Sequence, residues 1–350
     1  MRRYYTRVCN FYYGNESKLL IDKKKAIPLN SNKEISFDHF EIISRTSKKK
    51  FSIKKIDRLS EAIRKQISLD LKKIKSKKKN FANLNFKKIP NIMGVLNLTP
   101  DSFSDGGKFN FKKRGVEHAL KMFKLGANII DIGGESTRPG SNIVNKKLEW
   151  NRIKKTIRSI SRKIPMSLDT RKSEIMERGI KYGIKIINDV SGLSHDVKTI
   201  DILKKYKIPF VIQHSQGTPK NMQNQPIYKN ELLDIYDFFE EKIKFLRSIG
   251  IKHNNIIIDP GIGFGKNLKH NMNLISNISI FHSLGFPVLV GNSRKRFIKD
   301  LAGKNDTKTR IGGTVASAIY LMMQGVQILR IHDVNELLQG VKVFKELIKN

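Results

Sequence analysis

Asn91-Ile-Met-Gly-Val-Leu-Asn-Leu-Thr-Pro-Asp-Ser-Phe-Ser-Asp-Gly-Gly107 is the stretch that decides the fold of most of this 350-residue chain. Its first half, from Ile92 to Leu98, is a short apolar run typical of a buried strand. Its second half is polar and rich in turn-forming residues, which indicates a loop. Asn97 stands at the junction, where its amide oxygen could ligate a hard cation or simply end the strand in a turn.

The same arrangement of an apolar run and a polar tip recurs seven more times downstream, with amphipathic helical patterns in between. The eight runs are 92–98, 128–132, 165–168, 184–187, 209–212, 256–258, 287–290 and 327–331. The helical patterns are 115–125, 148–160, 172–182, 200–206, 232–249, 272–284, 313–323 and 336–348. Eight strand–helix units of this total size predict an α/β fold, a closed (β/α)8 TIM barrel. A doubly wound open sheet is the alternative, and it fits the number of units less well.

Each predicted strand is followed by polar residues, and in a barrel all eight tips meet at one face, where barrel enzymes carry their active sites. Buried polar groups cost stability unless they find partners, so eight converging polar tips indicate a binding site. The tips are Asn97 and the segments 131–140, 169–171, 188–192, 213–217, 259–266, 291–296 and 330–333.

The residue types at these tips favour a flat polar ring with an anionic group beside it. Acceptors and donors stand together in one set, which suits a heterocycle with adjacent N–H groups better than an apolar ligand; the set is Asp169, Asn188, Asp259 and Lys295. Asn97, Arg330 and His332 belong to the first and last strands, which are neighbours in a closed barrel. With a divalent cation they would form a site for a phosphate-type anion.

The glycine-rich segment 261–265 is similar to a phosphate-binding loop, but it lacks the full dinucleotide fingerprint. The Asp259-Pro260 pair before it also argues against a dinucleotide site.

Residues 1–88 differ from the remainder and predict a small basic accessory module before the barrel at 89–350. The first 90 residues hold 25 Lys and Arg against 8 Asp and Glu. Residues 37–43 have a strand pattern and residues 59–74 a helical stripe, while the Lys-rich run 75–80 is expected to be a solvated linker.

The net charge of +37 invites a nucleic-acid or anionic-surface interpretation. Lys, Asn and Ile dominate wherever residue choice looks free, so a compositional bias is the better explanation, and nucleic acid is not expected as a partner. No run of about 18 apolar residues predicts a membrane span. A single cysteine, Cys9, excludes an intramolecular disulfide and fits a reducing compartment such as the cytoplasm.

Taken together, five segments resemble the dihydropteroate synthase family between about residues 89 and 348: 97–107, 133–140, 259–266, 293–295 and 330–333. The resemblance implies condensation of 6-hydroxymethyl-7,8-dihydropterin diphosphate with 4-aminobenzoate, with Mg²⁺ as cofactor. It also implies an SN1-like loss of diphosphate and a homodimer.

The resemblance also assigns roles to single residues. Asn97 would meet Mg²⁺ on the diphosphate, and Arg330 and His332 would hold the same anion. The ring-binding residues would be Asp169, Asn188, Asp259 and Lys295. Thr137 would contact the substrate from the second loop, and the aminobenzoate would be placed by Arg138, Pro139 and Ser293. The expected catalytic residues are Asp169, Lys295, Arg330 and His332.

Two departures from the family pattern stand out. Gln213-His-Ser215 stands where Met-His-Met is more common, which predicts a more polar floor under the pterin. Arg296 stands where a serine is common, which puts the affinity for aminobenzoate in doubt.

Two other functions stay open at this point. A corrinoid-dependent methyltransferase would use the same pterin cup without a diphosphate site. A nucleic-acid-binding protein would act through residues 1–88.

Overall fold

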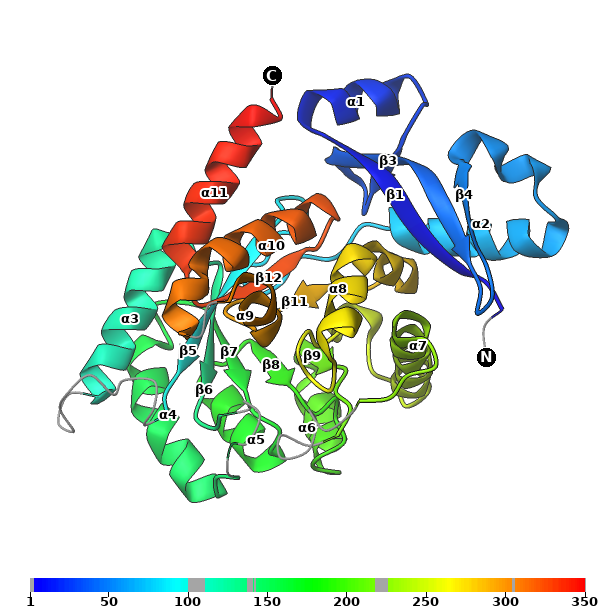
Figure 1. The fold of residues 1–350 in the computed structure, drawn as a ribbon. Coiled ribbons are helices and arrows are strands. Elements are labelled where there is room, and N and C mark those ends of the chain that lie inside the picture. The colour runs from blue at the N-terminus through cyan, green and yellow to red at the C-terminus, as the bar shows by residue number, and fades with distance from the viewer. Residues whose placement is uncertain are drawn as a thin grey trace.

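The computed structural model describes residues 3–99, 111–136, 141, 143–217, 226–303 and 306–349. Its centre is an eight-stranded parallel sheet in the order β10-β9-β8-β7-β6-β5-β12-β11 (Figure 1). The strands are β5 (Asn91–Asn97), β6 (Ile129–Gly133), β7 (Met166–Asp169), β8 (Ile186–Asp189), β9 (Phe210–Gln213), β10 (Ile256–Asp259), β11 (Leu289–Val290) and β12 (Ile328–Ile331). The ends of the sheet meet where the Ile258 amide donates to the Pro287 carbonyl at 3.0 Å. The TIM-barrel prediction and all eight predicted strands are therefore confirmed.

Alternate residues of every barrel strand except β7 belong to two different apolar clusters. One set fills the barrel interior together with Leu84 and Phe86, which close its amino-terminal end; its strand members are Met93, Ile129, Ile186, Val211, Ile257, Leu289 and Ile328. The residues between them, such as Ile130 and Ile212, pack against the outer helices. Because strand side chains alternate with a period of two, the inward positions two residues further on form the next interior layer. That layer is polar and forms the floor of the site.

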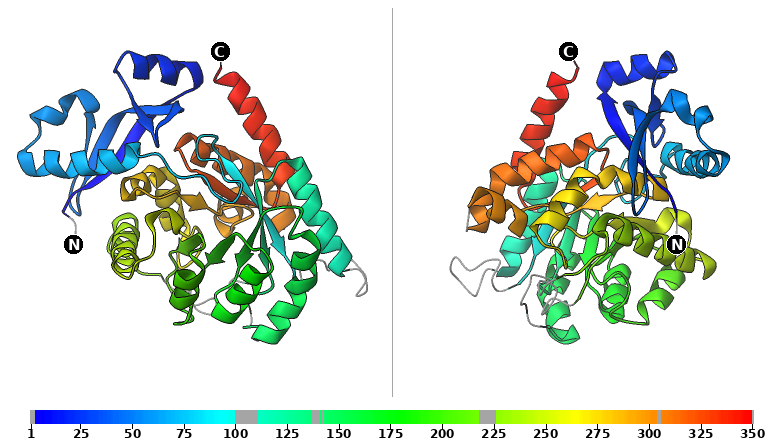
Figure 2. Two further views of the ribbon diagram at one scale, coloured as in Figure 1. Left: turned by 180° about the vertical axis from the view of Figure 1, so that it is seen from behind. Right: turned by 45° about the vertical axis from the view of Figure 1, so that its right-hand side comes forward.

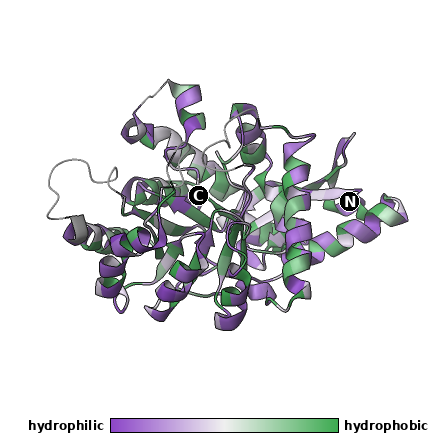
Figure 3. Cartoon of the chain, turned by 90° about the horizontal axis from the view of Figure 1, so that it is seen from below, coloured by the Kyte–Doolittle hydropathy of each residue, from purple (hydrophilic) through white to green (hydrophobic). Residues whose placement is uncertain are grey.

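The outer ring consists of α3 (Phe111–Leu125), α4 (Lys146–Ile160), α5 (Ser173–Lys181), α6 (Thr199–Tyr206), α7 (Glu231–Ser248), α8 (Leu268–Ser276), α9 (Arg296–Ala302), α10 (Ile311–Met323) and α11 (Val334–Leu347). Seen end-on, the barrel strands are mainly hydrophobic and the outer helix faces mainly hydrophilic (Figure 3). None of the helices in the described segments is long and apolar enough to cross a membrane.

The single helix predicted over 272–284 is wrong. α8 ends at Ser276, where the Asn277 amide donates back to the Asn273 carbonyl, and a 3-10 helix, η4 (Ile278–Leu284), follows. Every residue of η4 is buried, so it shows no polar face from which a helical period could be read. The seven-residue α9 was not predicted at all.

Residues before the barrel form an antiparallel sheet in which β3 (Asn32–Ile43) pairs with β1 (Tyr5–Tyr13) on one side, and with β2 (Ile27–Leu29) and β4 (Lys48–Ser52) on the other. Helix α1 (Gly14–Asp22) follows β1, and η1 (Ile53–Arg58) leads to α2 (Glu61–Lys75). The apolar side of α2 packs on the sheet through Ile67, Leu71 and Ile74. The strand predicted at 37–43 and the helix at 59–74 are confirmed, whereas β1, α1, β2 and β4 were missed.

This sheet docks on the outside of the barrel, with α1 beside the end of α11 (Figure 2). Tyr5 is fully buried, packs edge-on against Tyr236 and donates from its hydroxyl to Asp237 at 2.7 Å. Ser279 of η4 donates to the Val8 carbonyl at 2.7 Å. The module therefore covers the face of η4 that would be exposed to solvent in an ordinary outer helix.

The prediction that residues 75–80 are a solvated linker is wrong for Lys78. Its side chain is buried, and Nζ donates to the Gly285 carbonyl at 2.6 Å, to Ser76 Oγ at 3.0 Å and to the Lys73 carbonyl at 3.2 Å. Burial lowers the pKa of Lys78 to about 7. The carbonyls at the ends of α2 and η4 supply the acceptors, and their meeting cannot be read from a lysine run.

We expect Arg45→Met to lower the free energy of unfolding by about 1 to 2 kcal/mol, because Arg45 joins the module to two carboxylates of α7. Its guanidinium bonds Asp234 and, at 2.7 Å, Asp237, and all three side chains are less than one-third exposed. Denaturant titration measures the change. Lys18→Met is the matched control, since its pair with Glu34 is about half exposed and should contribute almost nothing. Equal losses in the two variants would contradict a special role for Arg45.

Candidate active site

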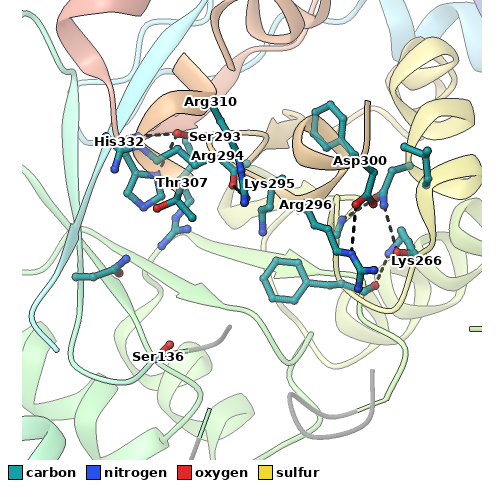
Figure 4. A pocket seen from close by; sticks show the side chains of 18 of the residues that line it. Ser136, Lys266, Ser293, Arg294, Lys295, Arg296, Asp300, Thr307, Arg310 and His332 are labelled. Atoms are coloured by element: carbon teal, nitrogen blue, oxygen red, sulfur yellow. Dashed lines mark hydrogen bonds and ion pairs between the residues drawn. The ribbon is translucent and has the colours of Figure 1, made fainter. Parts of the chain in front are cut away.

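A cavity of about 630 Å³ opens at the carboxyl ends of the barrel strands (Figure 4). Six predicted site residues line it: Asn97, Asp169, Ser293, Lys295, Arg330 and His332. Asn188 and Asp259 are buried in the adjoining inward-facing layer, at the ends of β8 and β10. Thr137, Arg138 and Pro139 lie outside the described residues. The structure thus brings eight of the predicted residues to one end of the barrel.

Asp131 is the centre of the polar layer, and sequence reasoning gave it no role. Its Oδ2 accepts from Arg330 Nε at 2.7 Å and from Asn188 Nδ2 at 3.0 Å. Arg330 Nη2 also donates to Asp169 Oδ2 at 2.7 Å. The sequence pattern could have identified Asp131 as a site residue, because it shares the inward face of β6 with Ile129. Arg330 therefore lies between two buried carboxylates and balances their charge.

Three oxygens of this layer are buried and have no hydrogen-bond partner among the described residues: Asp131 Oδ1, Asp169 Oδ1 and Asn188 Oδ1. A buried acceptor without a partner costs roughly 1 to 3 kcal/mol. A ligand that brings several N–H groups into the cup would remove this cost. The layer thus favours a flat, nitrogen-rich ring, as the sequence predicted.

Burial changes the pKa of each of the two carboxyl groups that face the ring site. It raises the pKa of Asp169, an effect that the Arg330 guanidinium opposes and the Asp131 charge reinforces. It also raises the pKa of Asp259 to about 6, although the Gly261 amide, 2.8 Å from Oδ1, and the Lys295 charge act the other way. Burial works against the charge of Arg330 too, but the carboxylates of Asp131 and Asp169 outweigh it and raise the pKa of Arg330. The guanidinium therefore stays cationic.

Lys295 reaches over the cavity from the loop after β11. Its Nζ lies 4.0 Å from the centroid of the Phe264 ring, a cation–π contact. In the same loop, Ser293 Oγ lies 3.2 Å from the His332 amide nitrogen, which donates to it, and 3.1 Å from His332 Nδ1. Figure 4 shows Lys295 between the Ser293–His332 pair and Lys266.

The cavity is lined by more cations than carboxylates, and of these cations only Arg310 lies outside the polar tips predicted from the sequence. The cationic side chains are Lys266, Arg294, Lys295, Arg296, Arg310 and Arg330, against Asp169 and Asp300. Arg294 is held by Asp333, and Arg310 Nη1 donates to the Arg294 carbonyl at 2.9 Å. A cleft lined by one sign of charge concentrates ligands of the other sign. The cavity therefore suits an anionic substrate.

The glycine-rich segment after β10 has a packing role. A Cβ at Gly261, where φ is +70°, would lie 2.0 Å from the His214 carbonyl oxygen. A Cβ at Gly265 would lie 2.4 Å from the Gln216 carbonyl oxygen. Only glycine permits this close approach of the loops after β9 and β10, and Lys266 then donates to the Phe264 carbonyl at 2.9 Å. This packing accounts for the glycines without a bound phosphate.

A buried ion-pair network fixes the loop after β6 to the end of β7. Glu135 accepts from Lys172 Nζ at 3.0 Å, from Arg171 Nε at 3.2 Å and from the Val144 amide at 2.8 Å. Lys172 also pairs at 2.5 Å with Glu149, which is fully buried. These contacts join both described ends of that loop to the strand that carries Asp169.

We expect Glu135→Gln to lower the free energy of unfolding by roughly 3 to 5 kcal/mol, because it leaves Arg171 and Lys172 buried with too little negative charge. Denaturant titration measures the loss. Glu174→Gln is the matched control, since Glu174 is exposed and its ion-pair partners in the described segments are exposed too. Similar losses for both would contradict the network's role.

The stability of Glu135→Gln should also depend on pH differently from the stability of wild type. Burial raises the pKa of Glu135, but the Val144 amide, Arg171 and Lys172 outweigh it, so the pKa lies below its usual range. The stability from such a carboxyl is present above its unfolded pKa and is lost as the pH falls through the folded one. Wild type should therefore lose stability below about pH 4.5 more steeply than Glu135→Gln.

The described residues contain no group of three His, Cys, Asp or Glu side chains suited to hold a metal ion. Asn97 is the hard oxygen ligand that the sequence proposed, and it is half-buried in the cavity wall. Mg²⁺ often takes only one or two protein ligands and completes its shell with substrate phosphates and water. The donor set fits a Mg²⁺ ion that arrives with a phosphorylated substrate.

Proteins of known function are similar to this chain in sequence and in structure. The family described as "Pterin binding enzyme" matches residues 93–332. Dihydropteroate synthase of Escherichia coli (strain K12) is 40% identical over 256 residues, which cover 73% of this chain and 90% of that protein. The protein of the same name from Synechocystis is 38% identical over 72% of this chain and 88% of its own length.

Solved structures agree with these relatives. Dihydropteroate synthase of Yersinia pestis with a sulfonamide drug matches with a TM-score of 0.72 and 38% identity, covering 76% of this chain and 97% of that one. The Xanthomonas albilineans enzyme in complex with 7,8-dihydropteroate matches with a TM-score of 0.68 and 32% identity, covering 75% and 95%. These names favour a synthase over a methyltransferase. The chain belongs to the pterin-binding enzymes and, among them, to the dihydropteroate synthase family.

Proposed function

We propose that this protein is a dihydropteroate synthase of folate biosynthesis. It condenses 6-hydroxymethyl-7,8-dihydropterin diphosphate with 4-aminobenzoate and releases 7,8-dihydropteroate and diphosphate. The observation that carries the proposal is the match to synthases over about nine-tenths of their length, on a barrel whose cup has unpartnered acceptors for a pterin ring.

The pterin ring enters the cup edge-on, where Asp169, Asn188 and Asp259 accept its N–H groups. Lys295 donates to a ring oxygen or nitrogen, and the nearby Phe264 gives an apolar surface. In this buried layer the low local dielectric makes each hydrogen bond to the ring stronger than it would be in water.

The diphosphate lies beside His332, Ser293 and Arg330. Asn97 would be the protein ligand of a Mg²⁺ ion, which when bound would supply charge neutralisation at the anion. Arg330 serves both parts of the site, because it balances Asp169 and adds positive charge near the anion.

The bond between the pterin methylene carbon and the diphosphate oxygen breaks first, in an SN1-like step. The ring delocalises the resulting cation, and the buried Asp169 and Asp259 carboxylates stabilise it by charge. The amine of 4-aminobenzoate, held near Ser293 and, by the family resemblance, Thr137, Arg138 and Pro139, then forms the C–N bond and loses a proton. An arylamine is unprotonated at neutral pH, so placement matters more than activation.

We further infer that residues 89–350 are the catalytic domain and residues 1–88 an accessory module. The family match, which begins at residue 93, supports this division. A homodimer and a cytoplasmic location are proposed from the family resemblance and the single cysteine.

Incubation with both substrates and Mg²⁺ tests the function, with dihydropteroate and diphosphate measured by chromatography. Equal amounts of the two products are expected, and no dihydropteroate should form without 4-aminobenzoate. A corrinoid-dependent methyltransferase would release no diphosphate, and that result would overturn the proposal.

A further inference from the structure

Gln213 is a member of the polar layer that the site described above does not use. It ends β9, whose Val211 lies in the interior cluster while Ile212 packs against the helices. By the same alternation Gln213 faces inward. It pairs in register with Asp259 of β10, as Asp169 does with Asn188 of β8. The carboxyl ends of β7 to β10 thus present two carboxylates and two amides in one arc.

The side chain of Gln213 is only 4% exposed, and its Nε2 is buried without a hydrogen-bond partner among the described residues. A buried amide donor left in this state costs roughly 1 to 3 kcal/mol. A methionine or leucine would fill the same volume without that cost. An orphaned donor within a layer of orphaned acceptors indicates that the missing partner is a ligand.

The geometry points to Gln213 as a specificity-determining residue that donates a hydrogen bond from Nε2 to an acceptor of the pterin ring, a ring nitrogen or the exocyclic oxygen. This inference rests on the proposed function. A ring of this class carries both N–H donors and acceptors along its edge. The orphaned oxygens of Asp169 and Asn188 match the ring donors, and Gln213 Nε2 matches a ring acceptor. The set therefore favours an oxo-substituted ring over a ring with donors alone.

The test compares Gln213→Met with wild type in three measurements. Affinity for the dihydropterin diphosphate, measured by calorimetry, should fall roughly 3- to 10-fold, the value of one neutral hydrogen bond. The KM for 4-aminobenzoate should stay unchanged. The melting temperature without ligand should rise by about 1 to 3 °C, because the variant no longer buries an unpaired donor.

Gln324→Met is the matched control. Gln324 also has a buried, unpartnered amide atom among the described residues, its acceptor Oε1, but it follows α10 beside the N-terminal module. It should gain thermal stability in the same way and keep wild-type pterin affinity. Gln213→Glu adds a second arm, because it keeps the shape and replaces the donor by an acceptor, so pterin affinity should fall by more than about 10-fold.

Unchanged pterin affinity in Gln213→Met or Gln213→Glu, with wild type binding normally, would overturn the inference and leave the synthase function standing. A wild-type protein that binds no dihydropterin diphosphate would instead overturn the proposed function itself. Should either variant fail to fold, the other still decides the result.

Discussion

Asp169→Asn is expected to lower kcat/KM for dihydropteroate formation by roughly 10²- to 10³-fold while the barrel stays folded. The substitution keeps the size of the side chain and an oxygen that can accept from Arg330. It removes the negative charge that faces the cation formed when diphosphate leaves. It also turns one acceptor into an NH₂ group, which repels the N–H groups of the ring. Steady-state kinetics with circular dichroism as the folding check measure both effects.

Asp300→Asn is the matched control for that experiment, since it makes the same chemical change in the same cavity. Asp300 pairs with the exposed Arg296 at 3.5 Å and touches none of the proposed ring-binding residues in the contacts of the described segments. Its kcat/KM should stay within about 3-fold of wild type. An Asp169→Asn enzyme as active as Asp300→Asn would show that Asp169 does not contact the reacting ring.

The barrel could be predicted because its signal is local and repeated. Each strand is a short apolar run, and a buried parallel strand needs nothing more. Even β11, with only Leu289 and Val290 in the sheet, falls inside the predicted run 287–290. The polar tips were predictable for the same reason, since each directly follows its strand.

The missed features depend on contacts between distant segments. η4 could not be told from an α-helix, because the module covers the face that would otherwise be exposed to solvent, through contacts such as the one between Ser279 and Val8, 271 residues apart in sequence. The buried Lys78 donates to the Gly285 carbonyl, and a run of lysines in the sequence does not indicate such a partner. Arg310 reaches the site through the Arg294 carbonyl, which only the folded chain brings near.

Asp131 is a different kind of omission. It occupies an inward position that the period of two defines once the strand is known, so a count along β6 would have added it to the site. Gln213 was noted from the sequence as a departure that makes the pterin floor more polar, but its unpartnered Nε2 is visible only in the folded chain. What the sequence could not supply is the pairing, in which Asp131 rather than a ligand holds Arg330 and Asn188.

Arg330→Met is expected to lower the free energy of unfolding by about 3 to 5 kcal/mol, because it leaves two buried carboxylates without their cation. Asp131 is fully buried and Asp169 nearly so, and both accept from the Arg330 guanidinium at 2.7 Å. Denaturant titration measures the loss. Arg178→Met is the control, because its pair with Glu174 is more than 40% exposed on both sides and should contribute almost nothing.

The loss of stability in Arg330→Met should also depend on pH. The direction of that dependence shows whether Arg330 stabilises the protein by charge balance or by packing. Burial already raises the pKa of Asp169, and Arg330 is the group that holds it down, so its removal raises that pKa further. A carboxyl with a raised folded pKa is stabilising when protonated, and that contribution disappears as the pH rises through the folded pKa. The deficit of the variant should therefore be smaller at pH 5 than at pH 8, and Asp131→Asn added to it should recover part of the loss at pH 8. A deficit that is equal at both pH values would mean that Arg330 contributes packing rather than charge balance, and the electrostatic account of the cup would then fail.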